Sequence, residues 1–120
     1  MTDLAQERCT ACRPGSPIVP LEERPHLLAA IPAWGVVEDE GIPRLSRVFT
    51  FRDYAAALQF VNAVAVAADE QDHHPNILLE VRRVTVWWWT HAIRNLHRND
   101  FVMAARTDQL YALDPPARVP

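Results

Sequence analysis

Apolar residues recur at helical spacing through one long segment in the middle of the chain. The stripe consists of residues three or four positions apart, widened by two neighbours: Tyr54, Leu58, Val61, Ala65 and Ala68, with Phe60 and Val64. This spacing places them along one face of a helix. The segment starts at Asp53 and has to stop before Pro75, because the proline ring pushes His74 towards extended geometry. We predict a long helix whose apolar stripe lies in the core.

Alternating apolar positions predict strands before that helix. Residues 45–51 place Phe49 and Phe51 on one face, since successive side chains of a strand point to opposite sides. Residues 34–38 also have strand character, and the turn-forming residues 39–41 lie between the two segments. Together these segments predict a β-hairpin.

The strand pattern after the helix changes phase at one point. Apolar residues stand first at odd and then at even positions: Ile77, Leu79 and Val81, followed by Val84, Val86 and Trp88. One straight strand cannot keep both sets on the same face, because its side chains alternate with a period of two. We therefore predict a bulge or turn around Arg82 and Arg83.

Two further helices are predicted, at residues 22–31 and 99–113. The first has Pro25 near its start, where a missing N–H does little harm, and Pro32 ends it. The resulting order is α-β-β-α-β-β-α. This order is typical of an α+β domain in which helices cover one face of an antiparallel sheet.

Prolines separate both ends of the chain from this domain. They lie on either side of it, at Pro14, Pro17 and Pro20 and at Pro115, Pro116 and Pro120. We predict a flexible N-terminal leader at residues 1–20, the domain at 21–113 and a proline-rich tail at 114–120.

The leader contains a C-x-x-C motif formed by Cys9 and Cys12. A four-ligand zinc site would need a second pair that the chain lacks, and a thioredoxin motif would follow a strand and open a helix. We interpret the motif as part of a loosely docked tail. Metal or redox chemistry stays open as the alternative.

Composition and charge narrow the function classes. A chain of 120 residues with 49% hydrophobic and 22% charged residues fits one globular domain. The net charge of −3 disfavours a nucleic-acid partner, since phosphate-binding proteins usually carry a basic excess. No apolar run approaches the roughly 18 residues of a membrane span, and the N-terminus lacks an apolar export signal. We expect a cytoplasmic protein.

Candidate chemistry lies in histidines of the second half of the chain: His73, His74, His91 and His97. Imidazole exchanges protons near neutral pH, and a nearby carboxylate such as Asp69 or Asp100 fixes its tautomer. Two other interpretations stay open, a histidine pair that complements a helix dipole and a three-histidine zinc site. The zinc site is disfavoured because the adjacent His73 and His74 point apart. We predict no metal.

Three consecutive tryptophans, Trp87 to Trp89, lie at the end of the last predicted strand. Neighbours on a strand face opposite sides, so the run is more typical of core plus interface than of a stacking platform. It predicts a homo-oligomer that hides part of this apolar surface.

The histidine motifs have a specific spacing along the chain. They read Asp72-His73-His74-Pro75, then Thr90-His91, then Asp100, with Arg47-Val48-Phe49-Thr50-Phe51 upstream. This set resembles the signature of the pterin-4a-carbinolamine dehydratase family, and the C-x-x-C leader resembles that of bacterial members. The resemblance implies a four-stranded antiparallel sheet with three helices on one face, and dimers or tetramers.

The resemblance also implies an activity. Enzymes of this family dehydrate a 4a-hydroxytetrahydropterin to the quinonoid dihydropterin without metal or cofactor. One histidine protonates the leaving hydroxyl while another removes the N5 proton. The implied residues are catalytic His73, His74, His91 and Asp100, and substrate-binding Asp69, Pro75 and Thr90.

The chain departs from the family's enzymes around this site. Residues 94–97 read Arg-Asn-Leu-His where the enzymes have glycine followed by a capping Thr or Ser. We expect His97 to weaken the cap of the last helix, which is worth about 1 kcal/mol. Arg82 and the tryptophans at 87–89 add charge and bulk, which we expect to obstruct a small pterin cleft.

These departures resemble a divergent branch of the family found in α-carboxysome operons and in plastids. Its dehydratase-like members act as Rubisco assembly factors. We therefore favour an assembly factor without catalysis, with Rubisco as partner and a cytoplasmic, carboxysome-associated location. The alternative is an active dehydratase that acts on a pterin through His73, His74 and His91.

Overall fold

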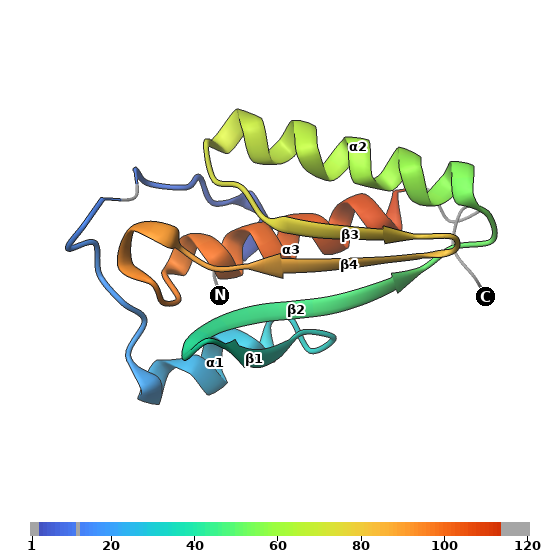
Figure 1. The fold of residues 1–120 in the computed structure, drawn as a ribbon. Coiled ribbons are helices and arrows are strands. Elements are labelled where there is room, and N and C mark those ends of the chain that lie inside the picture. The colour runs from blue at the N-terminus through green and yellow to red at the C-terminus, as the bar shows by residue number, and fades with distance from the viewer. Residues whose placement is uncertain (1–2, 12, 114–120) are drawn as a thin grey trace.

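The computed structural model describes residues 3–11 and 13–113, and its elements follow the predicted order (Figure 1). The helices and strands are α1 (Arg24–Ala29), β1 (Gly35–Asp39), β2 (Ile42–Thr50), α2 (Tyr54–Gln71), β3 (Asn76–Glu80), β4 (Arg83–Trp88) and α3 (Arg98–Ala112). Short 3-10 turns add η1 (Leu4–Gln6), η2 (Leu21–Glu23) and η3 (His91–Ile93). The predicted tail at 114–120 and Cys12 lie outside the described residues.

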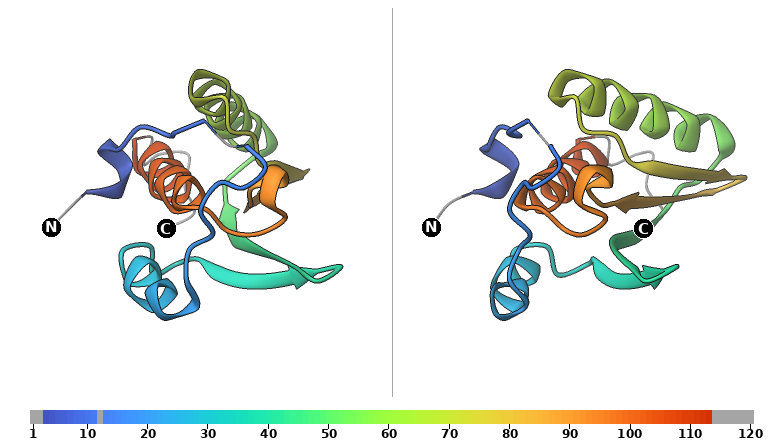
Figure 2. Two further views of the ribbon diagram at one scale, coloured as in Figure 1. Left: turned by 90° about the vertical axis from the view of Figure 1, so that its left-hand side faces the viewer. Right: turned by 60° about the vertical axis from the view of Figure 1, so that its left-hand side comes forward.

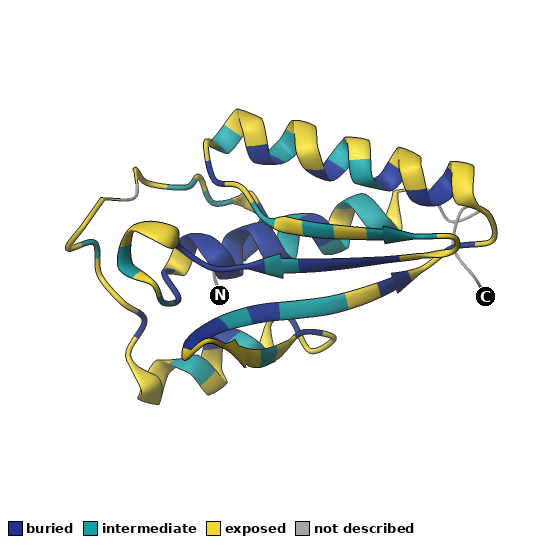
Figure 3. Cartoon of the chain, viewed as in Figure 1, coloured by how far each residue is buried: buried dark blue, intermediate teal, exposed yellow. Residues whose placement is uncertain are grey.

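The sheet forms one layer and the helices form the other (Figure 2). All neighbouring strands are antiparallel, in the order β1-β2-β4-β3. One core joins the sheet to Leu27 of α1, Phe60 of α2 and Phe101 of α3. Figure 3 shows the buried positions of α2 on its side towards the sheet. The predicted α+β class, with four strands and three helices, is confirmed.

The hairpin of β1 and β2 closes through a two-residue loop. Asp39 pairs with Ile42, and the loop residues Glu40 and Gly41 have φ values of 53° and 77°. Positive φ at both positions is the type I′ geometry, which matches the twist of the two strands. The predicted turn is therefore present, and β2 begins at Ile42, before the predicted position 45.

The long helix α2 has a defined cap at each end. The Asp53 carboxylate accepts a hydrogen bond from the Ala56 N–H at 2.8 Å, so this side chain satisfies a free donor of the first turn. At the other end Asp72 adopts left-handed geometry, with φ 51° and ψ 41°. This reversal stops the helix and sends His73 back towards the sheet before Pro75.

The predicted core stripe of α2 is partly wrong. Tyr54 and Leu58 are 52% and 41% exposed, while the buried positions are Ala56, Ala57, Phe60, Val64 and Ala68. Apolar residues cover more than one side of this helix, so periodicity alone does not decide which side faces the sheet. Phe60 decides it, because its ring packs against Phe49 and Phe51 of the sheet layer.

The predicted change of phase after α2 is a tight turn between two strands. β3 and β4 pair antiparallel with Glu80 opposite Arg83, and Val81 and Arg82 form the turn between them. Val84 is buried, whereas Val81 at the tip of the hairpin is exposed. The prediction of a bulge or turn at this place is confirmed.

The end helices have bounds slightly different from those predicted. The segment at 22–31 divides into η2 and the short α1, which ends at Ala29. The last helix, α3, begins at Arg98 and ends at Ala112.

The leader makes specific contacts with the domain. η1 packs on α3, and Leu4 and Ala5 are buried there. Further along, the Val19 N–H donates to the Leu96 carbonyl at 2.9 Å. Within the described residues no helix is long and apolar enough to cross a membrane.

Candidate functional site

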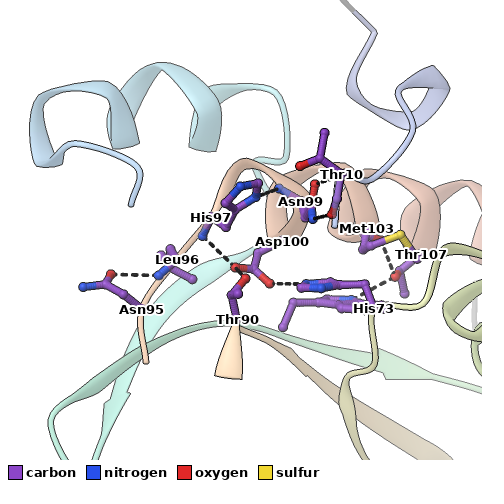
Figure 4. Close-up of polar contacts among 11 residues, drawn as sticks. Thr10, His73, Thr90, Asn95, Leu96, His97, Asn99, Asp100, Met103 and Thr107 are labelled. Atoms are coloured by element: carbon purple, nitrogen blue, oxygen red, sulfur yellow. Dashed lines mark hydrogen bonds and ion pairs between the residues drawn. The ribbon is translucent and has the colours of Figure 1, made fainter. Parts of the chain in front are cut away.

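A buried contact between His73 and Asp100 forms the centre of the site (Figure 4). His73 Nε2 lies 2.7 Å from Asp100 Oδ1, and the two side chains are 6% and 0% exposed. His73 follows the left-handed residue that ends α2, and Asp100 lies in the first turn of α3. Because the contact joins the ends of two helices, its geometry depends on how both ends are held.

The Asp100 carboxylate accepts hydrogen bonds on both of its oxygens. The Thr90 hydroxyl and the His97 N–H each donate to Oδ2 at 2.8 Å. A carboxylate accepts hydrogen bonds, so His73 Nε2 is the donor of this contact. The three donors fix the orientation of the carboxylate, and the carboxylate fixes the tautomer of His73.

The indole of Trp88 holds the plane of the His73 ring. The two rings are stacked, with centroids 5.7 Å apart and an angle of 5° between their planes. Trp88 is fully buried, and its Nε1 donates to the Thr107 hydroxyl at 3.1 Å. That hydroxyl donates in turn to the Met103 carbonyl at 2.6 Å. The imidazole is therefore supported from the side by the core and at its edge by Asp100.

His74 points to solvent where His73 points inward. Its Nε2 lies 3.2 Å from the Asp69 carboxylate in the last turn of α2, and its side chain is 56% exposed. His74, Asp69, Pro75 and Ile77 line one open hollow of about 420 Å³. A histidine at this position can exchange protons with a ligand or with solvent.

His91 lies in η3 next to an aromatic and cationic cluster. Its ring centroid is 4.3 Å from that of Trp89, and the Arg44 guanidinium lies 3.9 Å above the Trp89 ring. Partial burial lowers the pKa of His91, and the positive charges of His73 and Arg44 lower it further. His91 is therefore a neutral imidazole at neutral pH and can accept a proton.

The expectation that His97 weakens the cap of α3 is wrong. His97 Nδ1 accepts a hydrogen bond from the Asn99 N–H at 2.9 Å, while the His97 N–H donates to Asp100. The two residues thus form a reciprocal capping box, in which the imidazole nitrogen acts as the usual hydroxyl oxygen does. Burial lowers the pKa of His97, which keeps Nδ1 available as an acceptor.

Comparison with known proteins decides the family. The sequence model of the family described as pterin 4 alpha carbinolamine dehydratase matches residues 18–110. The chain belongs to this family. A relative from Saccharophagus degradans is 50% identical over 111 residues, covering 92% of this chain and 98% of its own. One from Gloeobacter violaceus is 52% identical over 110 residues, covering 92% and 95%. Both are named as candidate pterin-4-alpha-carbinolamine dehydratases.

Two solved structures of dehydratase-like proteins share the fold. A transcriptional coactivator/pterin dehydratase from Brucella melitensis matches with a TM-score of 0.73 and 27% identity, over 79% of this chain and 99% of its own. A pterin dehydratase-like protein identified as a RuBisCO assembly factor in the alpha-carboxysome matches with a TM-score of 0.57 and 29% identity, over 66% and 89%. The family resemblance seen in the sequence is confirmed.

The dehydratase-like site brings together most of the predicted residues. His73, Thr90 and Asp100 are joined by hydrogen bonds, and the charges of His73 and His74 act on the nearby His91. Asp69 contacts His74. Within the part of the chain that the structure describes, no three His, Cys, Asp or Glu side chains are grouped so that they could hold a metal ion.

Sequence analysis missed the supporting roles of Trp88, Arg44 and Asn99. Trp88 had a usable signal, because it shares the phase of the inward-facing Val84 and Val86. Arg44 had no such signal, since its stacking on Trp89 depends on the pairing of β2 with β4.

Proposed function

We propose that the protein is an active pterin-4a-carbinolamine dehydratase. The observation that carries this proposal is the buried contact of His73 with an Asp100 carboxylate that Thr90 also binds. Capping of α3 accounts for the bond from the His97 N–H to Asp100 Oδ2, whereas the contact of Oδ1 with His73 additionally orients an imidazole. This proposal reverses the preference for an assembly factor that the sequence alone suggested.

The reason for that preference was added bulk around the cleft, and the positions of Trp87, Trp88 and Arg82 weaken it. Trp88 is turned into the core, and Trp87 lies on the opposite side of β4. Arg82 lies in the hairpin turn, at the other end of β4 from Thr90. The relatives near 50% identity also carry dehydratase names.

The proposed reaction needs one proton donor and one proton acceptor. The C4a–O bond of the carbinolamine breaks as the hydroxyl takes a proton and leaves as water. The N5–H bond breaks, and its electron pair forms the N5=C4a double bond of the quinonoid product. We assign the acceptor to neutral His91 and the donor to solvent-exposed His74. His73, held by Asp100, orients the substrate between them.

The test is a dehydration assay with freshly generated 4a-hydroxytetrahydropterin. Product formation is followed by the absorbance of the quinonoid dihydropterin and compared with the spontaneous rate. We expect His91→Ala and His74→Ala, which remove the proposed acceptor and donor, to lower kcat by about 10²–10⁴-fold, the usual contribution of an acid or base. His26→Ala, an exposed histidine in α1, is the matched control and should keep the activity. Wild-type rates at the spontaneous background would overturn the proposal.

A Rubisco assembly factor is the second candidate function. The similarity to the alpha-carboxysome assembly factor favours it. If it is correct, co-expression should raise the yield of assembled Rubisco, and His91→Ala should leave that yield unchanged. A location at carboxysomes belongs to this candidate, whereas the dehydratase proposal places the protein in the cytoplasm with a pterin substrate.

A further inference from the structure

The leader binds the two helix ends that carry the His73–Asp100 contact. The Cys9 N–H donates to the Gln71 side-chain oxygen of α2 at 2.9 Å. One residue later, the Thr10 N–H donates to Asn99 Oδ1 at 3.0 Å, and Asn99 Nδ2 donates back to the Thr10 carbonyl at 2.7 Å. Figure 2 shows the leader passing over α3 towards the end of α2.

Both partners of the leader are close to site residues along the chain. Gln71 is the last residue of α2 and is followed, after Asp72, by His73. Asn99 directly precedes Asp100, and Figure 4 shows its side chain turned to Thr10 while Asp100 is turned to His73. The leader therefore bridges the end of α2 and the start of α3, the same two helix ends that the His73–Asp100 contact joins.

The leader is anchored on α3 ahead of these contacts. The Glu7 carboxylate accepts two hydrogen bonds from the Arg98 guanidinium, at 2.8 Å and 2.7 Å. The Glu7 carbonyl also accepts from Arg106 Nη2 at 2.6 Å. The hydrogen bond from Arg98 lowers the pKa of Glu7, so the carboxylate is ionised at neutral pH. Buried Leu4 adds an apolar anchor.

We propose that residues 7–10 are a clamp that positions Asp100 against His73, with Asn99 and Gln71 as positioning residues. First turns of helices fray readily, because their N–H groups lack partners within the helix. The paired hydrogen bonds of Asn99 hold the first turn of α3, while the bond to Gln71 holds the last turn of α2. A displacement of about 1 Å at such a contact can lower a catalytic rate about 10²-fold.

The clamp lies outside the part of the chain that the family model matches. That match begins at residue 18, after the clamp. The kinetic consequence of the clamp rests on the proposed dehydratase function.

The experiment compares single substitutions in the full-length chain. Asn99→Ala removes both side-chain bonds to Thr10 and keeps the backbone bond to His97. Gln71→Ala removes the other bond, and Gln71→Glu restores an acceptor for it. Ser16→Ala is the matched control, because it removes a hydrogen bond within the leader, from the Arg13 N–H.

Two readouts separate positioning from a loss of stability. We expect Asn99→Ala and Gln71→Ala to lower kcat by about 10- to 100-fold with KM nearly unchanged, and Gln71→Glu to restore most of it. In proton NMR, the downfield His73 Nε2–H resonance of the wild type should be lost or broadened in both alanine variants. Ser16→Ala should match the wild type in both readouts.

The outcomes distinguish this proposal from the proposed function. If both alanine variants keep the resonance and a kcat within twofold of the wild type, the clamp proposal is wrong and the dehydratase proposal is unaffected. If the wild type has no dehydratase activity, the proposed function is wrong and the clamp is tested by NMR alone. Loss or broadening of the His73 resonance in the alanine variants then supports the clamp, and its retention contradicts it. If Asn99→Ala does not fold, Gln71→Ala and Gln71→Glu give the same test at the other end of the clamp.

Discussion

Trp88 shows how a residue of the core can control the geometry of a reactive group. Its ring is stacked on His73 while its N–H is held by Thr107. We expect Trp88→Ala to lower the free energy of unfolding by about 3–5 kcal/mol, because it opens a large cavity in the core. Trp87→Ala, on the other face of the strand, should cost clearly less. Urea denaturation of both variants checks this, and equal losses would contradict the assignment of Trp88 to the core.

The cap formed by His97 predicts a pH dependence of stability. Burial lowers the pKa of His97 below its unfolded value of about 6.5. Between the folded and the unfolded pKa the unfolded chain binds more protons than the folded protein. The contribution of His97 to the free energy of unfolding is therefore fully present above the unfolded pKa and is lost as the pH falls through the folded pKa. Protonation of Nδ1 also removes the acceptor for the Asn99 N–H.

The test of the His97 prediction is a difference between two proteins. His97→Asn keeps a capping oxygen and removes the titration. We expect the free energy of unfolding of the wild type to fall more than that of His97→Asn between pH 7.5 and pH 5. Parallel curves would show that the cap does not titrate.

At the scale of residues, the sequence predicted those that belong to a chemical motif and missed those whose role depends on packing in the folded protein. His73, Thr90 and Asp100 were found because their spacing resembles a family signature. His97 was misjudged because cap preferences rank residue types and cannot show that an imidazole lone pair faces the Asn99 N–H.

At the scale of elements, strands were predicted better than the orientation of the long helix. The faces of β2 followed from alternation alone, with Phe49 buried and Val48 exposed. In α2 both Leu58 and Phe60 are apolar, and only packing against the sheet selects Phe60. The short α1 was overpredicted because the proline at 32 marks only the latest position at which it can end.

The cap at the start of α2 gives a prediction for an element. We expect Asp53→Ala to lower the free energy of unfolding by about 1 kcal/mol, because the Ala56 N–H loses its acceptor. Asp53→Ser retains a capping oxygen and should lose only a few tenths of a kcal/mol. Thermal or urea denaturation compares the two variants, and equal losses would show that charge rather than capping matters.

At the scale of the whole molecule, one face of the sheet is covered by none of the helices in residues 3–11 and 13–113 (Figure 2). Val48 and Leu78 lie on that face and are 51% and 46% exposed. We propose that a second copy of the chain covers them, as the tryptophan-rich strand suggested. Light scattering should then give a mass above the 13.6 kDa of the single chain at micromolar concentration.

The oligomer prediction has its own pair of variants. Val48→Glu should shift the protein towards the single-chain mass, since it places a charge in the proposed interface. Val81→Glu, at the exposed tip of the β3–β4 hairpin, is the control and should leave the mass unchanged. A wild-type mass of 13.6 kDa would contradict the prediction.

The contacts of the leader have a consequence for the order of events during synthesis. Thr10 and Asn99 are separated by 89 residues, and Glu7 and Arg106 by 99. The ribosome therefore releases the leader long before α3 exists to receive it, and the sheet and α2 emerge first. Closing so long a loop is the entropically costly step, so it follows the more local pairings. On the proposed role of the clamp, the site is complete only when residues 7–10 have bound α3.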